Sequence, residues 1–146
     1  MDNKTTLPAA VIDTSFMVAA VFSAFSEDEN KSAAAFMEDI ISRNGQFYVP
    51  QIFWFEFGNV LVSASRPGKN GKPARLTADE VLQIESILAD YPIYTDPQPD
   101  IATRMRIREL AEKNGLSFYD ASYYELALRH NLPLKTFDEA LEKLID

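Results

Sequence analysis

The stretch from Ala9 to Ser15 constrains the fold of this chain more than any other part of the sequence. Four small or branched apolar residues run directly into Asp13, and two hydroxyl residues, Thr14 and Ser15, follow. A short run that is apolar throughout is typical of a strand whose two sheet faces are both covered. Thr14 or Ser15 can cap a helix that begins at this point. The stretch therefore predicts a buried strand that carries a carboxylate to the edge of a sheet.

Apolar runs of strand length alternate with helical patterns along the rest of the chain. This alternation predicts an α/β fold, a three-layer α/β/α sandwich around a short parallel sheet of four strands, with room for a fifth. The length of 146 residues suits one domain spanning residues 1–146. Thr77 and Glu80 match a helix-capping box. The expected strands lie at residues 7–12, 47–49, 92–94 and 132–136, and two of the expected helices span 51–65 and 117–129.

The net charge of −8 argues against a protein that binds nucleic acid through a broadly basic surface. One stretch differs, because Arg66, Lys69, Lys72 and Arg75 lie within ten residues that contain no acid. These residues either form an ordinary solvated loop or flank an acidic cleft and hold a phosphate backbone. We expect no membrane span, since no segment is long and apolar enough. The chain has no cysteine, which excludes disulfides and thiolate metal sites and is consistent with a cytoplasmic protein.

Four acids stand out, and three of them can be explained individually as helix caps. Asp13 and Asp138 follow predicted strands, and Asp120 completes a capping-box pattern with Ser117. Glu56 is different, because we place it about two turns inside a helix that is apolar almost all round and is expected to be buried. An unpaired, ionised carboxylate in that position would cost several kcal/mol. Glu56 therefore requires a cation, a hydrogen-bond network or water.

The polar residues of the 51–65 helix and its end indicate which side faces a cleft. Glu56, Asn59, Ser63 and Arg66 recur at helical spacing and form a single stripe. Arg66 lies about 15 Å from Glu56 along the helix axis, which is too far for a side-chain ion pair. A metal ion or a wet cleft is the better explanation for Glu56.

Considered together, the four acids predict a metal site. Ligands of open parallel sheets bind beyond the carboxyl ends of the strands, and Asp13 and Asp138 both follow strands. If those two strands are neighbours, both acids project over the same edge, where Glu56 and Asp120 can reach them from helices. Four crowded carboxylates repel one another unless a cation lies among them. Oxygen ligands without histidine or cysteine favour Mg²⁺ or Mn²⁺.

These motifs, in this order, resemble the PIN-domain family, and most closely the VapC-type toxins of bacterial and archaeal toxin–antitoxin pairs. The resemblance covers nearly the whole chain, and its strength lies in four short motifs that occur in register. The motifs are Val11-Ile12-Asp13-Thr14-Ser15, Glu56-x-x-Asn59, Leu116-Ser117-x-x-Asp120-Ala121 and Leu132-Pro133-Leu134-x-Thr136-x-Asp138.

The resemblance implies a metal-dependent ribonuclease that acts on structured RNA, forms a homodimer and is inhibited by a cognate antitoxin. Its mechanism would be hydrolysis of a phosphodiester bond by a metal-activated water. The implied catalytic and metal-binding residues are Asp13, Glu56, Asp120 and Asp138, with Thr14, Asn59 and Thr136 supporting them. The chain departs from the family in two ways: it stops soon after Asp138, where many relatives continue into an edge strand, and its basic loop is longer than a compact member needs.

Two other interpretations are open. A PIN-like domain can be catalytically idle and serve to bind RNA or protein, because a fold does not determine function. A phosphate-handling domain of the receiver type would need an acidic pair before the first-strand acid and a lysine after the last strand. The residues before Asp13 are apolar and Lys135 lies inside the fourth predicted strand, so the sequence gives the receiver interpretation little support.

Overall fold

One parallel sheet organises the computed structural model, which describes residues 7–23 and 31–145. Its strand order is β3-β2-β1-β4, so the first strand lies inside the sheet. Val11 of β1 is paired with Tyr48 on one side and with Leu134 on the other. The predicted α/β class with four parallel strands is confirmed, and the described residues add no fifth strand. The strands are β1 (Ala9–Ile12), β2 (Gln46–Val49), β3 (Ile93–Thr95) and β4 (Leu134–Lys135).

Helices connect the strands, and their ends follow the capping residues in the sequence. Thr77 and Glu80 form the predicted capping box, with both reciprocal hydrogen bonds present. In the described ranges, no helix is both long enough and apolar enough to cross a membrane. The helices are α1 (Thr14–Phe22), α2 (Lys31–Ser42), α3 (Ile52–Ser65), α4 (Ala78–Asp90), α5 (Ile101–Asn114), α6 (Phe118–His130) and α7 (Glu139–Ile145), with a short 3₁₀ helix at Lys69–Gly71.

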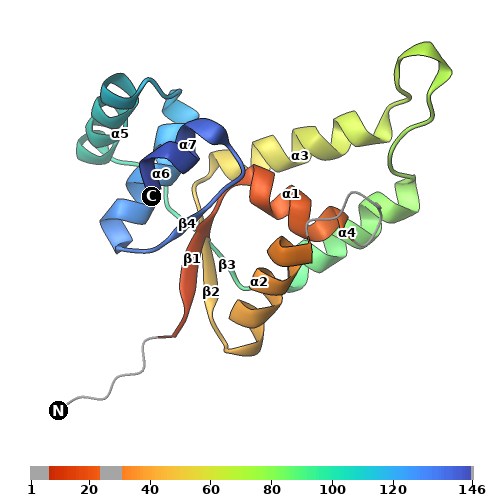
Figure 1. Cartoon of the computed structure of the whole chain (residues 1–146), viewed down its shortest axis with the longest axis horizontal. Coiled ribbons are helices and arrows are strands. Elements are labelled where there is room, and N and C mark those ends of the chain that lie inside the picture. The colour runs from red at the N-terminus through yellow and green to blue at the C-terminus, as the bar shows by residue number, and fades with distance from the viewer. Residues whose placement is uncertain (1–6, 24–30, 146) are drawn as a thin grey trace.

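The sheet is covered on both faces, as the sandwich prediction requires. Figure 1 shows α5 and α6 on one side of the strands and α1, α2 and α4 on the other. Val11 and Ile12 of β1 are fully buried, and Phe47 of β2 lies beside them in the same apolar core. A smaller apolar cluster joins α5 to α6 around Ile107 and Ala121. β1 therefore ends in the centre of the molecule, with Asp13 as the next residue.

The prediction that α3 is buried almost all round is wrong. Phe53, Phe57 and Leu61 face the core, but Phe55 is 76% exposed and Trp54 is 40% exposed. The described residues leave the outer face of this helix uncovered, although its sequence is apolar there. Glu56 also lies nearer the beginning of the helix than predicted, because α3 begins at Ile52.

Candidate active site

Asp13 lies at the carboxyl end of β1 and caps helix α1. Its Oδ1 accepts hydrogen bonds from the Phe16 amide at 2.9 Å and the Ser15 hydroxyl at 2.7 Å. Its Oδ2 accepts a hydrogen bond from the Thr136 hydroxyl, which follows β4. The capping role and the position at the sheet edge therefore coexist in one residue. The cap is Asp13 itself, and neither Thr14 nor Ser15 fills that role.

Burial raises the pKa of the Asp13 carboxyl above its usual value. Hydrogen bonds from Thr136, Ser15 and Phe16 oppose that effect, whereas the negative charge of Asp138 adds to it. Desolvation disfavours the charged form of a carboxyl, and hydrogen bonds to the carboxylate favour it. Asp13 is thus held in a fixed orientation in a place where an added cation would be favourable.

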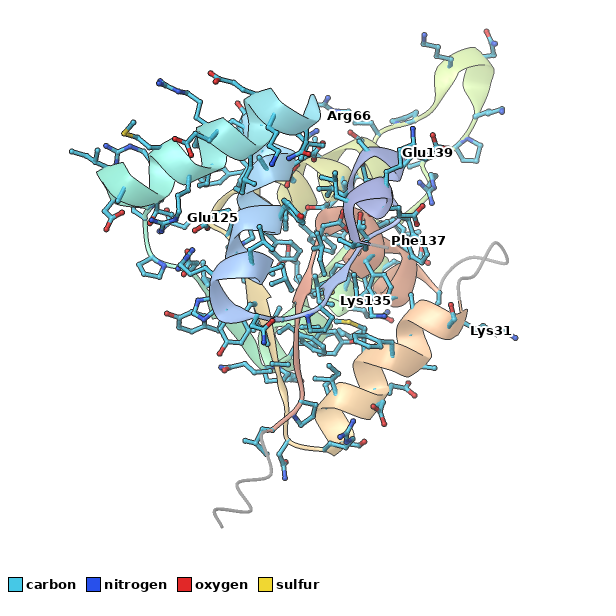
Figure 2. All side chains as sticks on the ribbon, turned by 60° about the vertical axis from the view of Figure 1, so that its left-hand side comes forward. Lys31, Arg66, Glu125, Lys135, Phe137 and Glu139 are labelled. Carbon is cyan, nitrogen blue, oxygen red and sulfur yellow. The ribbon has the colours of Figure 1, made fainter. Side chains whose placement is uncertain are left out.

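The turn after β4 is tied to the turn after β1. The Phe137 amide donates to the Ser15 hydroxyl at 2.9 Å, and the Asp138 amide donates to the Thr136 hydroxyl at 2.9 Å. Asp138 also accepts a hydrogen bond from the Leu141 amide in α7, at 3.1 Å. Figure 2 labels Phe137, the residue before Asp138, beside the short helix α7. The neighbouring strands β1 and β4 therefore bring Asp13 and Asp138 to one edge, as predicted.

Glu56 reaches the same region from α3, and two hydroxyl groups hold it. The phenol of Tyr123 donates to Glu56 Oε1 at 2.7 Å, and the Thr14 hydroxyl donates to the same oxygen at 3.2 Å. The hydroxyls of Thr14 and Tyr123 are themselves 3.0 Å apart. The sequence indicated that Glu56 requires a cation, a hydrogen-bond network or water. The structure supplies a hydrogen-bond network. Glu56 is half-buried, not enclosed in the core.

Tyr123 is a site residue that the sequence reasoning missed. It is 1% exposed, and burial raises its pKa far above the usual value, with the hydrogen bond to Glu56 as the next cause. The phenol therefore stays protonated and remains a donor. Its spacing from Asp120, three positions along α6, puts both residues on one side of that helix. This spacing is the feature of the sequence that could have linked Tyr123 to the site. The spacing alone does not indicate that Tyr123 contacts Glu56.

Asp120 enters from the first turn of α6, where the Ser117 hydroxyl accepts a hydrogen bond from its amide. Its pKa is raised, first by burial and then by the negative charges of Asp138, Glu56 and Asp13, in that order. The cap of α6 is Ser117. The negative charges of the other three predicted acids therefore act on the carboxyl of Asp120.

The four acids supply a donor set that suits a hard divalent cation. All the donors are carboxylate oxygens, and burial, followed by the negative charge of neighbouring acids, raises the pKa of Asp120 and Asp13. In the described part of the chain, however, no three acidic or histidine side chains are drawn closely enough together to hold one ion. The donor chemistry therefore suits such an ion, although the described side chains do not form a closed set of ligands.

The other predicted site residues lie further from the carboxylates. Asn59 is exposed on α3, about one turn beyond Glu56. The basic residues are all exposed, in a loop that projects from the far end of α3 (Figure 1). Arg66, labelled in Figure 2, begins that loop, and Arg75 ends it with its guanidinium 5.5 Å from the ring of Phe22. The basic loop is therefore separated from the acids by most of the length of a helix.

The fold and the acidic edge define a class: an α/β domain with carboxylates gathered at the carboxyl ends of a parallel sheet. The sequence of this chain matches the family model of the PIN domain over residues 10–145. The chain belongs to the PIN-domain family. A comparison with curated proteins finds no match.

Solved structures with low sequence identity share the fold. PAE2754 of Pyrobaculum aerophilum is 21% identical, with a TM-score of 0.64 over 96% of this chain and 81% of that one. VapC20 of Mycobacterium tuberculosis, a sarcin–ricin loop cleaving toxin, is 13% identical, with a TM-score of 0.61 over 92% and 94%. A toxin–antitoxin complex from Klebsiella pneumoniae contains a chain that is 20% identical, with a TM-score of 0.57 over 88% and 86%.

Proposed function

We propose that this protein is a metal-dependent endoribonuclease and the toxin of a toxin–antitoxin pair. The single observation that carries the proposal is that four elements of a PIN domain bring acids toward one edge of its sheet. Asp13 and Asp138 come from the ends of two adjacent strands, and Glu56 and Asp120 come from two helices. Such an edge is where open parallel sheets bind their ligands.

The four carboxylates would hold Mg²⁺ or Mn²⁺, directly or through water. When bound, the ion would lower the pKa of a water molecule and offset negative charge on the scissile phosphate. The hydroxyls of Ser15 and Thr136 fix the orientation of Asp13, and those of Thr14 and Tyr123 fix Glu56. Hydrogen bonds of this kind orient the carboxylate oxygens toward a metal ion and increase the affinity for it. The protein itself needs to supply no nucleophile.

The charge distribution suits an RNA substrate only in part. The net charge is −8, and the site acids contribute four negative charges that bound cations would offset. Arg66, Lys69, Lys72 and Arg75 form an exposed basic loop away from the site. We assign these residues to the RNA backbone at a distance from the bond that is cut, because contacts to phosphates position a nucleic acid without reading its sequence.

The partners follow from the family and from the names of the fold relatives. VapC20 is named as a toxin that cleaves the sarcin–ricin loop, and the Klebsiella pneumoniae relative is part of a toxin–antitoxin complex. We propose a cognate antitoxin for this chain, a cytoplasmic location and a homodimer. The uncovered apolar face of α3, with Phe55 and Trp54, is consistent with a protein–protein contact.

One observation favours an alternative, a PIN domain that binds RNA or protein without cutting it. Among the described residues, no three of the acids lie close enough together to hold one ion. RNA cleavage by the purified protein in Mg²⁺ or Mn²⁺ separates the two functions. The nuclease proposal predicts cuts that disappear in EDTA and in Asp13→Asn and Asp120→Asn. Cleavage at the wild-type rate by both variants would contradict the site assignment, and no cleavage by the wild type would support the idle module.

A further inference from the structure

An open cavity of about 200 Å³ is lined by the beginning of α3, by α5 and by α6 from Phe118 to Arg129. The loop that leads from β3 into α5 completes its wall. Its walls are mostly apolar and include Ile52, Ile107, Phe118 and Tyr119, together with prolines 50, 97 and 99. A preformed apolar cavity with a few polar groups is the usual form of a ligand site.

The charged groups of the cavity, Asp96, Glu125 and Arg129, belong to one ion network that Arg106 completes. Arg129 donates to Asp96 at 2.6 and 3.1 Å and to Glu125 at 2.9 and 3.0 Å, and Arg106 contacts Glu125 at 3.4 Å. Figure 2 labels Glu125 on α6, beside α5. Every buried side-chain polar atom of the described residues has a partner. Because the two cations and the two acids offset each other, the cavity does not call for a charged ligand.

The cavity and the acids share the same two helices. Ile52 lines the cavity and lies four residues before Glu56, on the same side of α3, which is about one helical turn. Tyr119 lines the cavity and directly precedes Asp120. Phe118 and Tyr119 remain 41% and 57% exposed, so their rings are available at the rim. A group inside the cavity would therefore lie against residues that are within one helical turn of Glu56 and Asp120.

We propose that this cavity accepts one unstacked nucleobase of the RNA, next to the nucleotide at which the chain is cut. The inference rests on the proposed ribonuclease function. RNA-binding proteins recognise splayed bases by stacking them on aromatic rings and by hydrogen bonds to their edges. A base is flat, neutral and largely apolar, with polar atoms only at its edge. Those properties match rings at the rim and a neutralised polar network inside.

An apolar side chain of a partner protein is the rival occupant. The position of the cavity favours RNA, because two of its lining residues lie within a turn of Glu56 and Asp120, where the phosphate would sit. The experiment therefore includes a probe for each occupant.

The test follows the methyl signals of Ile52 and Ile107 by NMR while each of the four nucleoside 5′-monophosphates is added in EDTA. We expect at least one nucleotide to shift both signals to saturation, with affinity about tenfold weaker in Phe118→Ala/Tyr119→Ala. Phe55→Ala removes an exposed ring that does not line the cavity, and it should bind like the wild type. Unchanged methyl signals elsewhere in the spectrum would show that the variants are folded.

Two results would overturn the proposal. In the first, no nucleotide shifts the two methyl signals, or the double variant binds as tightly as the wild type. In the second, N-acetyl-tryptophanamide shifts them and nucleotides do not, which would assign the cavity to a protein side chain. The assay uses no metal and measures no cleavage, so its failure is distinct from failure of the proposed function. If the wild type cleaves RNA but binds no nucleotide in this cavity, the base-pocket proposal is wrong and the ribonuclease proposal stands.

Discussion

Tyr123 donates a hydrogen bond of 2.7 Å to Glu56, a residue 67 positions earlier in the chain. The pair joins α6 to α3 directly beneath the acidic edge. Tyr123 is buried, and burial raises the pKa of its phenol, so the hydroxyl remains a donor that holds one Glu56 oxygen. The other Glu56 oxygen is left for a ligand. The relationship makes Tyr123 a positioning residue for the proposed metal site.

Removing the phenolic hydroxyl tests this role. Tyr123→Phe keeps the buried ring and deletes only the donor, so Glu56 should lose its fixed orientation. We expect Mn²⁺ to bind about tenfold more weakly by calorimetry, because supporting hydrogen bonds of metal ligands commonly carry that effect. Tyr124→Phe, one residue further along α6, is the matched control and should bind like the wild type. Equal Mn²⁺ affinity in all three proteins would remove Tyr123 from the site.

The raised pKa values of Asp13 and Asp120 predict how stability depends on pH. Both carboxyls hold their proton more readily in the folded protein than in the unfolded chain, where the usual value is 3.8. Between 3.8 and the raised values the folded state binds more protons, so the contribution of these two groups to stability falls as pH rises through that window.

Thermal unfolding of the metal-free protein in EDTA measures this contribution. The difference in melting temperature between the wild type and Asp13→Asn/Asp120→Asn should change in favour of the double variant as pH rises from about 4, since the variant has no charges there to repel. A constant difference across the window would mean that these carboxyls do not titrate abnormally.

The sheet and the order of its acids could be predicted from the sequence for physical reasons. The run from Ala9 to Ile12 has no polar residue because both faces of β1 are covered, and Asp13 follows because the strand ends there. Thr77 and Glu80 could be assigned because a capping box is local. These features depend on neighbouring residues in the sequence, where patterns are informative.

The remaining features depend on contacts between distant segments. The sequence of α3 does not indicate that Phe55 faces outward, because an apolar residue on an uncovered face resembles one in the core. The hydrogen-bond partner of Glu56 could not be identified from the sequence either. Nothing in the sequence around Tyr123 shows that the packing of α6 against α3 brings its hydroxyl to Glu56. The same holds for the link between Arg129 and Asp96, which joins α6 to the end of β3.

Arg129 should be important for stability independently of the acidic site. It pairs with Asp96 and Glu125, whose side chains are 11% and 3% exposed. Arg129→Met would leave two buried carboxylates with only Arg106 nearby, and we expect a loss of about 3 kcal/mol in urea denaturation. Arg43→Met breaks the exposed pair with Asp39 and should cost less than about 1 kcal/mol. Similar losses in both variants would show that the buried network is unimportant.

The basic loop makes a separate prediction about RNA. Replacing Arg66, Lys69, Lys72 and Arg75 with alanine should weaken RNA binding and reduce the slope of log affinity against log salt by about 3, because up to four phosphate contacts are lost. Binding is measured with Asp13→Asn in both backgrounds, so that the RNA stays intact. Arg43→Ala removes one exposed charge outside the loop and should leave the slope almost unchanged. An unaltered slope in the fourfold variant would mark these residues as an ordinary solvated loop.

We propose that Asp13, Glu56, Asp120 and Asp138 bind a divalent metal together, and Mn²⁺ titration by calorimetry tests this assignment. We expect saturable binding to the wild type, and binding at least tenfold weaker in each of Asp13→Asn, Glu56→Gln, Asp120→Asn and Asp138→Asn. Asp39→Asn, on the exposed surface of α2, should bind like the wild type. A folded wild type that binds no Mn²⁺ would contradict the proposed metal site, and so would four site variants that bind Mn²⁺ as tightly as Asp39→Asn does.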